Sequence, residues 1–341
     1  MKKKVKVGNV VLGNGNIIIQ SMTNTDTKDV QRTVDQINNL ASAGAELVRI
    51  SIPDKESALA VKDIVSSSPI PIIGDIHFSA DPALIAIESG ISKIRINPYN
   101  MSENDLKQVI HKCSQYSVPV RVGVNKGSSK RILTPKELAV SAVECSKRIE
   151  DYGLNDIVLA VKSSSVKDTV EAFRYLSELT DYPLHVGLTE SGTEQSGIIK
   201  SSIAIGSLLL DGIGDTIRVS LAADPVKEVF AAKKILRAVG IDKEFVEVIA
   251  CPTCARTNFD VQGVAEKVEE ITKNYKKKVK IAVMGCVVNG IGESMDADFG
   301  VAGGKDKSVL FKRGEIFKTI PNSDIFSEIL LYLDEEEKNN G

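Results

Sequence analysis

Short β-branched runs alternate with longer amphipathic segments over the first 240 residues. The amphipathic segments have helical periodicity, as in Asp29–Ala43, Asn104–Tyr116, Pro135–Tyr152 and Val166–Thr180. The apolar runs between such segments are the predicted strands: Ile17–Ile19, Leu47–Ile52, Ile70–Ile76, Ile94–Ile96, Val118–Val124, Asp156–Val161, Leu184–Leu188 and Thr216–Val219. Eight consecutive β/α units favour a (β/α)₈ TIM-type barrel. A doubly wound open sheet is the alternative, but no Gly-x-Gly-x-x-Gly follows the first strand.

The remaining chain predicts a hairpin before the barrel and a smaller α+β domain after it. Residues 1–20 alternate weakly and contain the turn signal Gly13-Asn14-Gly15. A helix over 224–240 closes the barrel, so we place the domains at 1–240 and 241–341. The predicted elements of the second domain are a strand at Phe245–Ala250, a helix at 262–275, a strand at Lys280–Met284, a hairpin at Lys307–Ile320 and a helix at Ile325–Leu333.

Polar side chains cluster where the predicted barrel strands end. They are Arg49, Ser51, Asp75, His77, Arg95, Asn97, Arg121, Asn125, Lys162, Glu190, Arg218 and Ser220. Barrel enzymes place their chemistry at the carboxyl ends of their strands. A lone arginine in a strand would normally be a solvated or ion-paired side chain, but cations from five different strands would repel one another in a pocket of low dielectric constant. A diphosphate-sized anion bound in the barrel mouth would resolve this repulsion, because guanidinium groups bind phosphate oxygens in a bidentate manner.

Some of these groups allow a second interpretation. His77 is either a satisfied core histidine or a functional residue beside Asp75. Glu190 is either a salt-bridge partner or a proton donor at the mouth. His111 and His185 have no functional context in the sequence and are predicted to be structural. The loop 123–129 lacks the ending of a phosphate-binding loop, which argues against an ATP site.

Three of the five cysteines lie in one stretch of the second domain. Cys251 and Cys254 have the Cys-x-x-Cys spacing, and Cys286 follows the next predicted strand. A strand–turn–helix–strand unit can therefore bring three sulfurs to one metal centre. The glycine-punctuated loop that follows adds one carboxylate, Glu293. An iron–sulfur cluster is the favoured interpretation, while a structural zinc ion and a redox-active cysteine pair remain open.

Composition limits the function classes. The 341 residues are 43% hydrophobic and 26% charged with a formal net charge of −2, so no attraction to nucleic acid or an anionic membrane is implied. No apolar run is long enough for a membrane span, and the basic start lacks the apolar segment of a signal peptide. Cys113 and Cys145 lie in helical patterns as small buried residues. This use of cysteine predicts a reducing, cytoplasmic location.

The motifs CPTCARTNFD and MGCVVNGIGESMDADFG resemble those of the 4-hydroxy-3-methylbut-2-enyl diphosphate synthase family in its compact bacterial form. The segments QSMTNTDT, GDIHF, KIRINPYN, VRVGVN, HVGLTESG and DTIRVSL are similar too, so the resemblance covers nearly the whole chain. It implies a [4Fe-4S] cluster held by Cys251, Cys254, Cys286 and Glu293. It also assigns protonation to Glu190, and substrate binding to Arg49, His77, Arg95, Asn97, Arg121, Asn125, Lys162, Arg218 and Ser220.

The family reaction that the resemblance implies is a two-electron reduction. 2-C-methyl-D-erythritol 2,4-cyclodiphosphate loses its ring and water to form (E)-4-hydroxy-3-methylbut-2-enyl diphosphate, in non-mevalonate isoprenoid biosynthesis. The implied electron donor is flavodoxin or ferredoxin, and the implied assembly is a homodimer whose cluster domain caps the partner's barrel. The alternatives are a non-catalytic iron–sulfur sensor on the same scaffold and a zinc-stabilised barrel enzyme.

Overall fold

The computed structural model describes residues 2–77, 79–125, 133–242, 245–273, 275 and 277–338. The chain divides into two compact units, Met1–Ile241 and Asp242–Gly341. In the described part of the chain, no helix is both long and apolar enough to cross a membrane.

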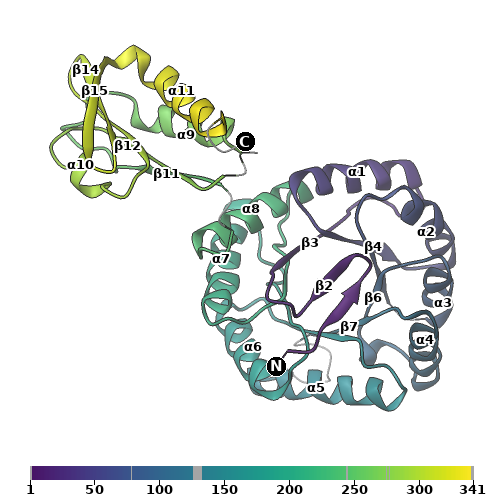
Figure 1. The fold of residues 1–341 in the computed structure, drawn as a ribbon. Helices are drawn as coiled ribbons and strands as arrows, with labels where there is room; N and C mark the ends of the chain where they lie inside the picture. Colours follow the sequence, from purple (N-terminus) through teal and green to yellow (C-terminus); the bar gives the residue numbers. More distant parts are fainter. Residues whose placement is uncertain are drawn as a thin grey trace. The chain divides into compact units, whose positions relative to one another are not determined.

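The first unit is a parallel eight-stranded barrel inside a ring of helices (Figure 1). Its strands are β3 (Ile18–Met22), β4 (Leu47–Ile52), β5 (Ile72–Ile76), β6 (Lys93–Ile96), β7 (Val120–Asn125), β8 (Ile157–Lys162), β9 (His185–Val186) and β10 (Thr216–Ile217). The sheet has the order β8-β7-β6-β5-β4-β3-β10-β9, and one bridge between Leu159 and Leu184 joins its two ends. The predicted barrel is confirmed.

Eight helices follow the strands in turn. They are α1 (Val30–Ala43), α2 (Lys55–Ser67), α3 (Ala80–Glu88), α4 (Glu103–Tyr116), α5 (Pro135–Asp151), α6 (Val166–Leu179), α7 (Glu194–Leu210) and α8 (Pro225–Ala238), with a short 3₁₀ turn at Pro98–Asn100. Local sequence determines where several of them begin. At α5, for example, Thr134 and Glu137 form a capping box, and Pro135 occupies the first turn, where its missing N–H costs nothing.

The last two barrel strands are shorter than predicted. The apolar runs continue to Leu188 and Val219, but the ladders end at Val186 and Ile217. Leu188 and Val219 are each only 1% exposed. The apolar runs are therefore longer than the strands, because these side chains remain buried in the protein interior where the backbone no longer pairs with a neighbouring strand.

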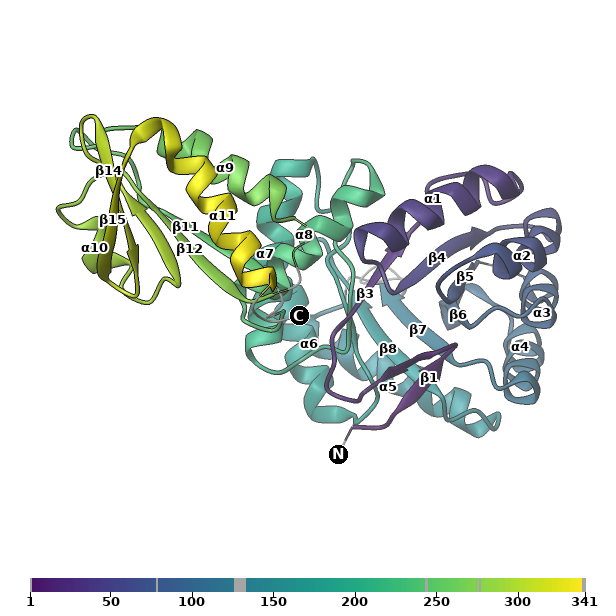
Figure 2. The ribbon, with the colours of Figure 1, turned by 45° about the horizontal axis from the view of Figure 1, so that its top comes forward.

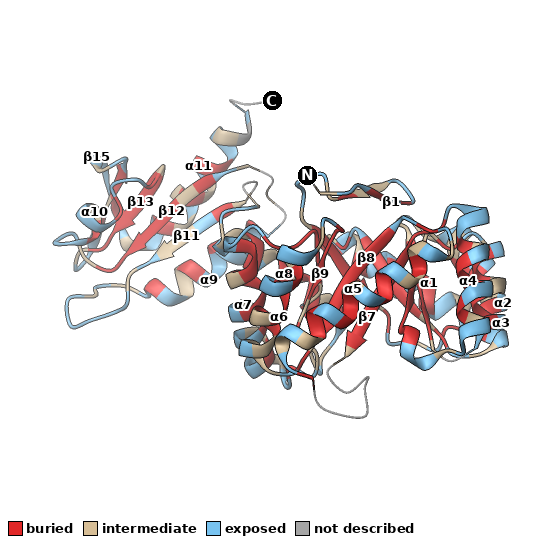
Figure 3. Cartoon of the chain, turned by 90° about the horizontal axis from the view of Figure 1, so that it is seen from below, coloured by how far each residue is buried: buried red, intermediate tan, exposed pale blue. Residues whose placement is uncertain are grey.

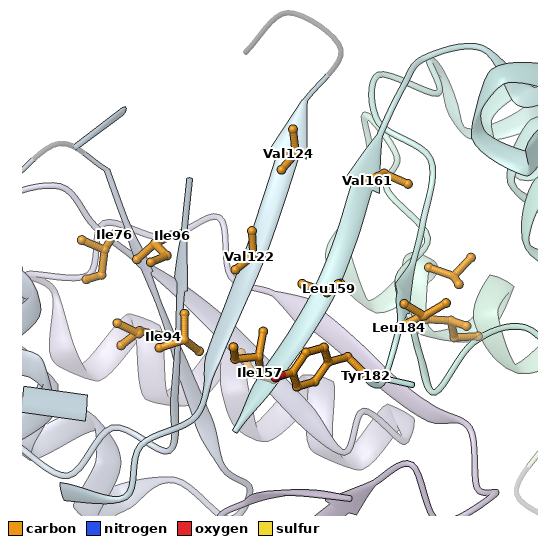
Figure 4. Close-up of a cluster of buried hydrophobic side chains, with 14 of the residues drawn as sticks. Ile76, Ile94, Ile96, Val122, Val124, Ile157, Leu159, Val161, Tyr182 and Leu184 are labelled. Atoms are coloured by element: carbon orange, nitrogen blue, oxygen red, sulfur yellow. The ribbon is translucent and has the colours of Figure 1, made fainter. Parts of the chain in front are cut away.

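The alternation of residues along each strand separates two environments. Ile94, Ile96, Val122 and Val124 are fully buried and belong to the large apolar cluster that also contains the inner faces of the helices (Figure 4). Strands and inner helix faces are mostly buried, whereas the outer helix faces are exposed (Figure 3). The intervening residues of the strands face the barrel interior, because successive side chains point to opposite faces.

An N-terminal hairpin closes one end of the barrel (Figure 2). Its strands β1 (Val5–Val7) and β2 (Val10–Leu12) are antiparallel. Val5, Val7 and Leu12 form a buried cluster with the interior residues Ile18, Leu47, Ile73 and Val158. This apolar plug separates the lower barrel interior from water.

The second unit contains one five-stranded mixed sheet. Its elements are β11 (Val246–Ala250), α9 (Val261–Ile271), β12 (Val279–Met284), α10 (Gly290–Glu293), β13 (Phe299–Ala302), β14 (Lys307–Lys312), β15 (Glu315–Pro321), a 3₁₀ turn at Asn322–Asp324 and α11 (Ile325–Lys338). The strands β11, β12 and β13 are parallel, and β14 and β15 form the predicted hairpin. Arg313 and Gly314 turn the hairpin with φ of 49° and 84°, the positive pair that a type I′ turn requires.

The apolar plug generates a stability prediction. Leu12→Ala removes a fully buried side chain and should lower the free energy of unfolding by about 2–5 kcal/mol. The matched control is Leu59→Ala, since Leu59 is 60% exposed and its loss should change stability by about 0.5 kcal/mol or less. Urea unfolding of both variants checks this expectation, and equal losses would show that the hairpin does not contribute to the core.

Candidate functional site

The register of the barrel strands brings the predicted site residues together. Ser51 on β4 pairs with Asp75 on β5, Asp75 with Arg95 on β6, and Arg95 with Arg121 on β7. Paired residues of parallel strands project to the same face of the sheet. Arg49, Asp75, Arg95 and Arg121 are all buried, so their side chains meet inside the barrel rather than in solvent.

Asp75 lies between two arginines. Its Oδ1 accepts a hydrogen bond from Arg95 Nη1 at 3.2 Å, and its Oδ2 lies 3.6 Å from Arg49 Nε. Burial raises the pKa of the Asp75 carboxyl, but the combined charges of Arg49, Arg95 and Arg121 outweigh this effect and hold the pKa below its usual value. Burial lowers the pKa of Arg49 to about 10, and Asp75 partly opposes that change. Asp75 is therefore an ionised counter-ion shared between two strands.

A second carboxylate, Glu228 on α8, was not among the residues predicted from the sequence. Its Oε2 lies 3.4 Å from Arg218 Nη2, and its Oε1 accepts the Leu221 N–H at 2.8 Å. Glu228 is 5% exposed. Burial raises the pKa of its carboxyl, and Arg218 partly offsets this rise. Nothing in the sequence indicated that Glu228 pairs with an arginine of the barrel. An acidic residue in the first turn of a helix is ordinarily explained by its favourable interaction with the helix dipole.

Arg121 and Lys93 are the largest fully buried side chains among the described residues. Within the described residues, neither the three guanidinium nitrogens of Arg121 nor the Lys93 Nζ has a hydrogen-bond partner. Burial lowers the pKa of both groups, and neighbouring positive charges lower it further. Buried donors without acceptors are costly, so this interior is chemically incomplete without an anion or ordered water.

His185 lies in this interior too. Its Nδ1 is 2.6 Å from Thr216 Oγ1, and it lines a cavity of about 20 Å³ together with Arg49, Lys162 and Arg218. Burial, with the nearby charges of Arg121 and Lys93, lowers the pKa of the imidazole well below its usual value. Burial likewise lowers the pKa of Lys162. The sequence predicted only a structural role for His185. Its apolar neighbours in the chain gave no sign that the folded protein places it beside the predicted anion-binding residues.

Other predicted residues lie near or beyond the carboxyl ends of the barrel strands. His77 Nε2 is 3.4 Å from Ser51 Oγ. Asn97 Oδ1 accepts the Tyr99 N–H and caps the turn after β6, so part of its capacity is structural. Asn125 ends β7 and is half-buried, and the adjoining residues 126–129 of the rejected phosphate loop lie outside the described residues. Glu190 is exposed after β9 and has a left-handed backbone, with φ of 54°.

Two neighbouring parallel strands position the cysteines of the second unit. Ala250 at the end of β11 pairs with Val283 on β12, so Cys251 and Cys286 follow at the same edge of the sheet. The Cys251 N–H donates to the Val283 carbonyl at 3.2 Å, and the Gly285 N–H donates to Cys251 Sγ at 3.1 Å. A backbone N–H that points at a sulfur atom is the kind of hydrogen bond that a cysteine thiolate accepts.

Arg256 connects the other members of the predicted ligand set. A hydrogen bond with Cys254, followed by the charges of Cys254, Cys286 and Glu293, raises its pKa. The Arg256 N–H lowers the pKa of the exposed Cys254 thiol in return. Even so, no three His, Cys, Asp or Glu side chains of the described ranges are arranged to hold a metal ion. The donor types and their shared edge fit a thiolate-held metal centre, but the side chains do not adopt its geometry.

The fold and these residues define a class of protein: a TIM-barrel protein with a cationic barrel interior, joined to a cysteine-bearing α+β domain. Residues 2–233 match the GcpE TIM-barrel domain, and residues 247–335 match the GcpE protein C-terminal domain. The chain belongs to the GcpE family.

Similar curated proteins span the whole chain. The 4-hydroxy-3-methylbut-2-en-1-yl diphosphate synthase (flavodoxin) of Clostridium perfringens is 49% identical over 337 residues, covering 96% of this chain and 97% of that protein. The protein of the same description from Thermotoga maritima is 49% identical over 338 residues, covering 98% of each chain.

Two solved structures share part of this fold. Dihydropteroate synthase from Stenotrophomonas maltophilia has a TM-score of 0.54 at 14% identity, and covers 70% of this chain and 98% of its own. The Yersinia pestis enzyme of the same name has a TM-score of 0.54 at 16% identity, with 70% and 98% covered. At such low identity, the likeness concerns the fold.

The depressed pKa of Asp75 predicts how stability depends on pH. Its ion pairs stabilise the folded state fully above the unfolded-state pKa of about 3.9, and this stabilisation is lost as the pH falls through the lower folded-state value. Asp75→Asn should therefore lower the free energy of unfolding by about 3 kcal/mol at neutral pH, because it breaks a buried pair. The deficit should shrink below about pH 4.

Urea unfolding of the wild type and Asp75→Asn across this range measures the deficit. Asp211→Asn is the control, because it breaks the solvent-exposed pair between Arg174 and Asp211 and should cost about 1 kcal/mol or less. A deficit for Asp75→Asn that is equally large in strong acid would contradict the ionised state assigned to this carboxyl.

Proposed function

We propose that this protein is an oxidoreductase that forms (E)-4-hydroxy-3-methylbut-2-enyl diphosphate from 2-C-methyl-D-erythritol 2,4-cyclodiphosphate. Two electrons and two protons enter, the cyclic diphosphate opens and one water molecule leaves. The curated relatives carry the name of this synthase over nearly their full length. The observation that carries the proposal is Arg121, a fully buried guanidinium group without an acceptor among the described residues. A substrate diphosphate supplies that acceptor.

The barrel residues would divide the work of binding. Arg49, Arg95, Arg121, Lys162 and Arg218 would neutralise the diphosphate, and charge that develops on the leaving phosphate oxygen would meet fixed positive groups. His77, Asn97, Asn125 and Ser220 would orient the remaining oxygens as hydrogen-bonding partners. Glu190 would hold a proton for the departing hydroxyl group, since it is a carboxyl on the loop that follows β9.

The second unit would hold the redox centre. Cys251, Cys254, Cys286 and Glu293 would ligate a [4Fe-4S] cluster, with the carboxylate of Glu293 as the one oxygen ligand. When bound, such a cluster supplies electrons one at a time. Support comes from the Cys251 and Cys286 positions at one sheet edge and from the lowered pKa of the Cys254 thiol.

The donor would be a flavodoxin, which the names of the relatives include, or a ferredoxin. We place the enzyme in the cytoplasm, where thiols stay reduced. A non-catalytic sensor would have no need of unpartnered cations inside the barrel, and the relatives are named as enzymes. The comparisons give the sensor alternative no support.

We further propose a homodimer in which the cysteine-bearing unit of one copy covers the barrel mouth of the other. The chain consists of two compact units, Met1–Ile241 and Asp242–Gly341. The proposed cysteine ligands lie in one unit and the proposed diphosphate-binding residues in the other. Turnover therefore requires the two units to meet, within one chain or between two.

Anaerobic turnover of the cyclic diphosphate by the reconstituted protein, with an artificial one-electron reductant, tests the reaction. The protein should contain iron and sulfide and form product, and Cys286→Ala should lose both the cluster and at least about 99% of the turnover. The control is Cys113→Ala, which removes a buried barrel sulfur and should retain both. No turnover by protein with a verified four-iron cluster would refute the proposed substrate, and a zinc-containing protein would refute the cluster.

Mixing two inactive variants tests the dimer. Arg121→Ala removes the central cation of the barrel, and Cys286→Ala removes a proposed cluster ligand. If one copy covers the other, mixed dimers should recover up to about one quarter of wild-type activity, because half of the dimers are mixed and each has one intact site. Native mass spectrometry verifies that mixed dimers form. Absence of activity in verified mixed dimers would favour contact within one chain.

A further inference from the structure

We propose that Asp75 and Glu228 are positioning residues, which hold the guanidinium groups of the barrel mouth in register for an anion. The inference rests on the proposed function, and it extends that function to two carboxylates that touch no substrate. Both are only 5% exposed, although each lies among cations that are expected to bind an anion. A carboxylate in an anion site opposes the ligand by charge, so its presence needs a structural reason.

Asp75 is placed to align two arginines at once. The strand β5 lies between β4 and β6, and the two carboxylate oxygens of Asp75 reach in both directions. Oδ2 lies 3.6 Å from Arg49 Nε, and Oδ1 lies 3.2 Å from Arg95 Nη1. The two guanidinium groups would otherwise repel each other within a region of low dielectric constant.

Glu228 performs the same task for Arg218, which follows β10. It reaches from α8 to Arg218 Nη2, at 3.4 Å, and at the same time accepts the Leu221 N–H, at 2.8 Å. One carboxylate therefore ties the guanidinium group of Arg218 to the backbone next to Ser220. Arg218 and Ser220 are both proposed substrate-binding residues.

The remaining contacts of these arginines are weak. Met22 Sδ accepts weak hydrogen bonds from Arg49 Nε, at 3.1 Å, and Arg218 Nη1, at 3.4 Å. A thioether is a weak acceptor that phosphate oxygens can replace. Arg121 has no acceptor among the described residues. The mouth thus combines arginines held by carboxylates with one arginine that is left for the anion.

Two physical effects compete, and they have opposite signs. Removal of a negative charge from a cationic pocket strengthens anion binding by Coulomb attraction. Loss of an anchoring carboxylate weakens binding, because long arginine side chains then have to be ordered by the ligand itself. Our inference requires the second effect to dominate, so it predicts that neutralising Asp75 or Glu228 weakens the binding of an anion.

The test is calorimetric titration of inorganic pyrophosphate into the full-length, cluster-loaded protein. Asp75→Asn and Glu228→Gln should each raise the dissociation constant by about tenfold or more, the loss typical of residues that orient a ligand-binding group. Asp211→Asn also removes one carboxylate from an ion pair, but on the surface, and should change the constant by less than about twofold. Circular dichroism verifies that each variant is folded. If Asp75→Asn does not fold, Glu228→Gln alone decides.

Turnover kinetics separate positioning from a general structural defect. Both variants should raise KM by about the same factor as the pyrophosphate dissociation constant, with kcat within about threefold of wild type. A damaged fold would instead reduce kcat at constant KM. Unchanged or tighter pyrophosphate binding in folded variants would overturn the inference and leave the proposed function intact. Failure of the wild type to bind pyrophosphate would overturn the anion site, and both proposals with it.

Discussion

Excess positive charge inside the barrel is the constraint on which the rest of the structure depends. The cationic side chains that lie on its strands or directly after them include Arg49, Lys93, Arg95, Arg121, Lys162 and Arg218. Within the described residues, their counter-ions are Asp75 and Glu228. TIM barrels ordinarily fill this volume with branched apolar side chains. Here the part of the volume above the apolar plug is kept polar, and its energetic deficit is resolved only when an anion or ordered water satisfies the remaining donors.

Such an interior can exist because apolar packing surrounds it. The outward residues of the strands, such as Ile94 and Val122, join the helices in one continuous core (Figure 4). The N-terminal hairpin seals the lower end with Val7 and Leu12. Hydrophobic burial of this extent stabilises the fold well enough to tolerate a strained, charged centre. Parallel strands then direct the proposed substrate-binding side chains of the barrel to the same end.

The second unit applies the same geometry to a different chemistry. The parallel pair β11 and β12 places Cys251 and Cys286 at one edge, although 34 intervening positions separate them along the chain. The backbone therefore brings the proposed ligand loops together, while the side chains of Cys254 and Glu293 lie around Arg256 rather than in a metal-binding arrangement. Strand pairing sets the first level of order, and bonds to the proposed cluster would set the second.

By itself, the sequence determined the features that depend on neighbouring residues. The alternation of apolar runs and helical segments identified the barrel. Polar residues at strand ends predicted a binding site at its mouth, and the Cys-x-x-Cys spacing predicted the ligand loops. Only the tertiary structure revealed Glu228, Lys93 and His185 in the interior, and the sharing of Asp75 between two strands. The reason is physical: a sequence pattern reports which face a residue occupies, whereas charge pairing depends on distances across the barrel. Met22 and Arg218 lie 196 positions apart in the chain, yet a sulfur of one contacts a guanidinium group of the other.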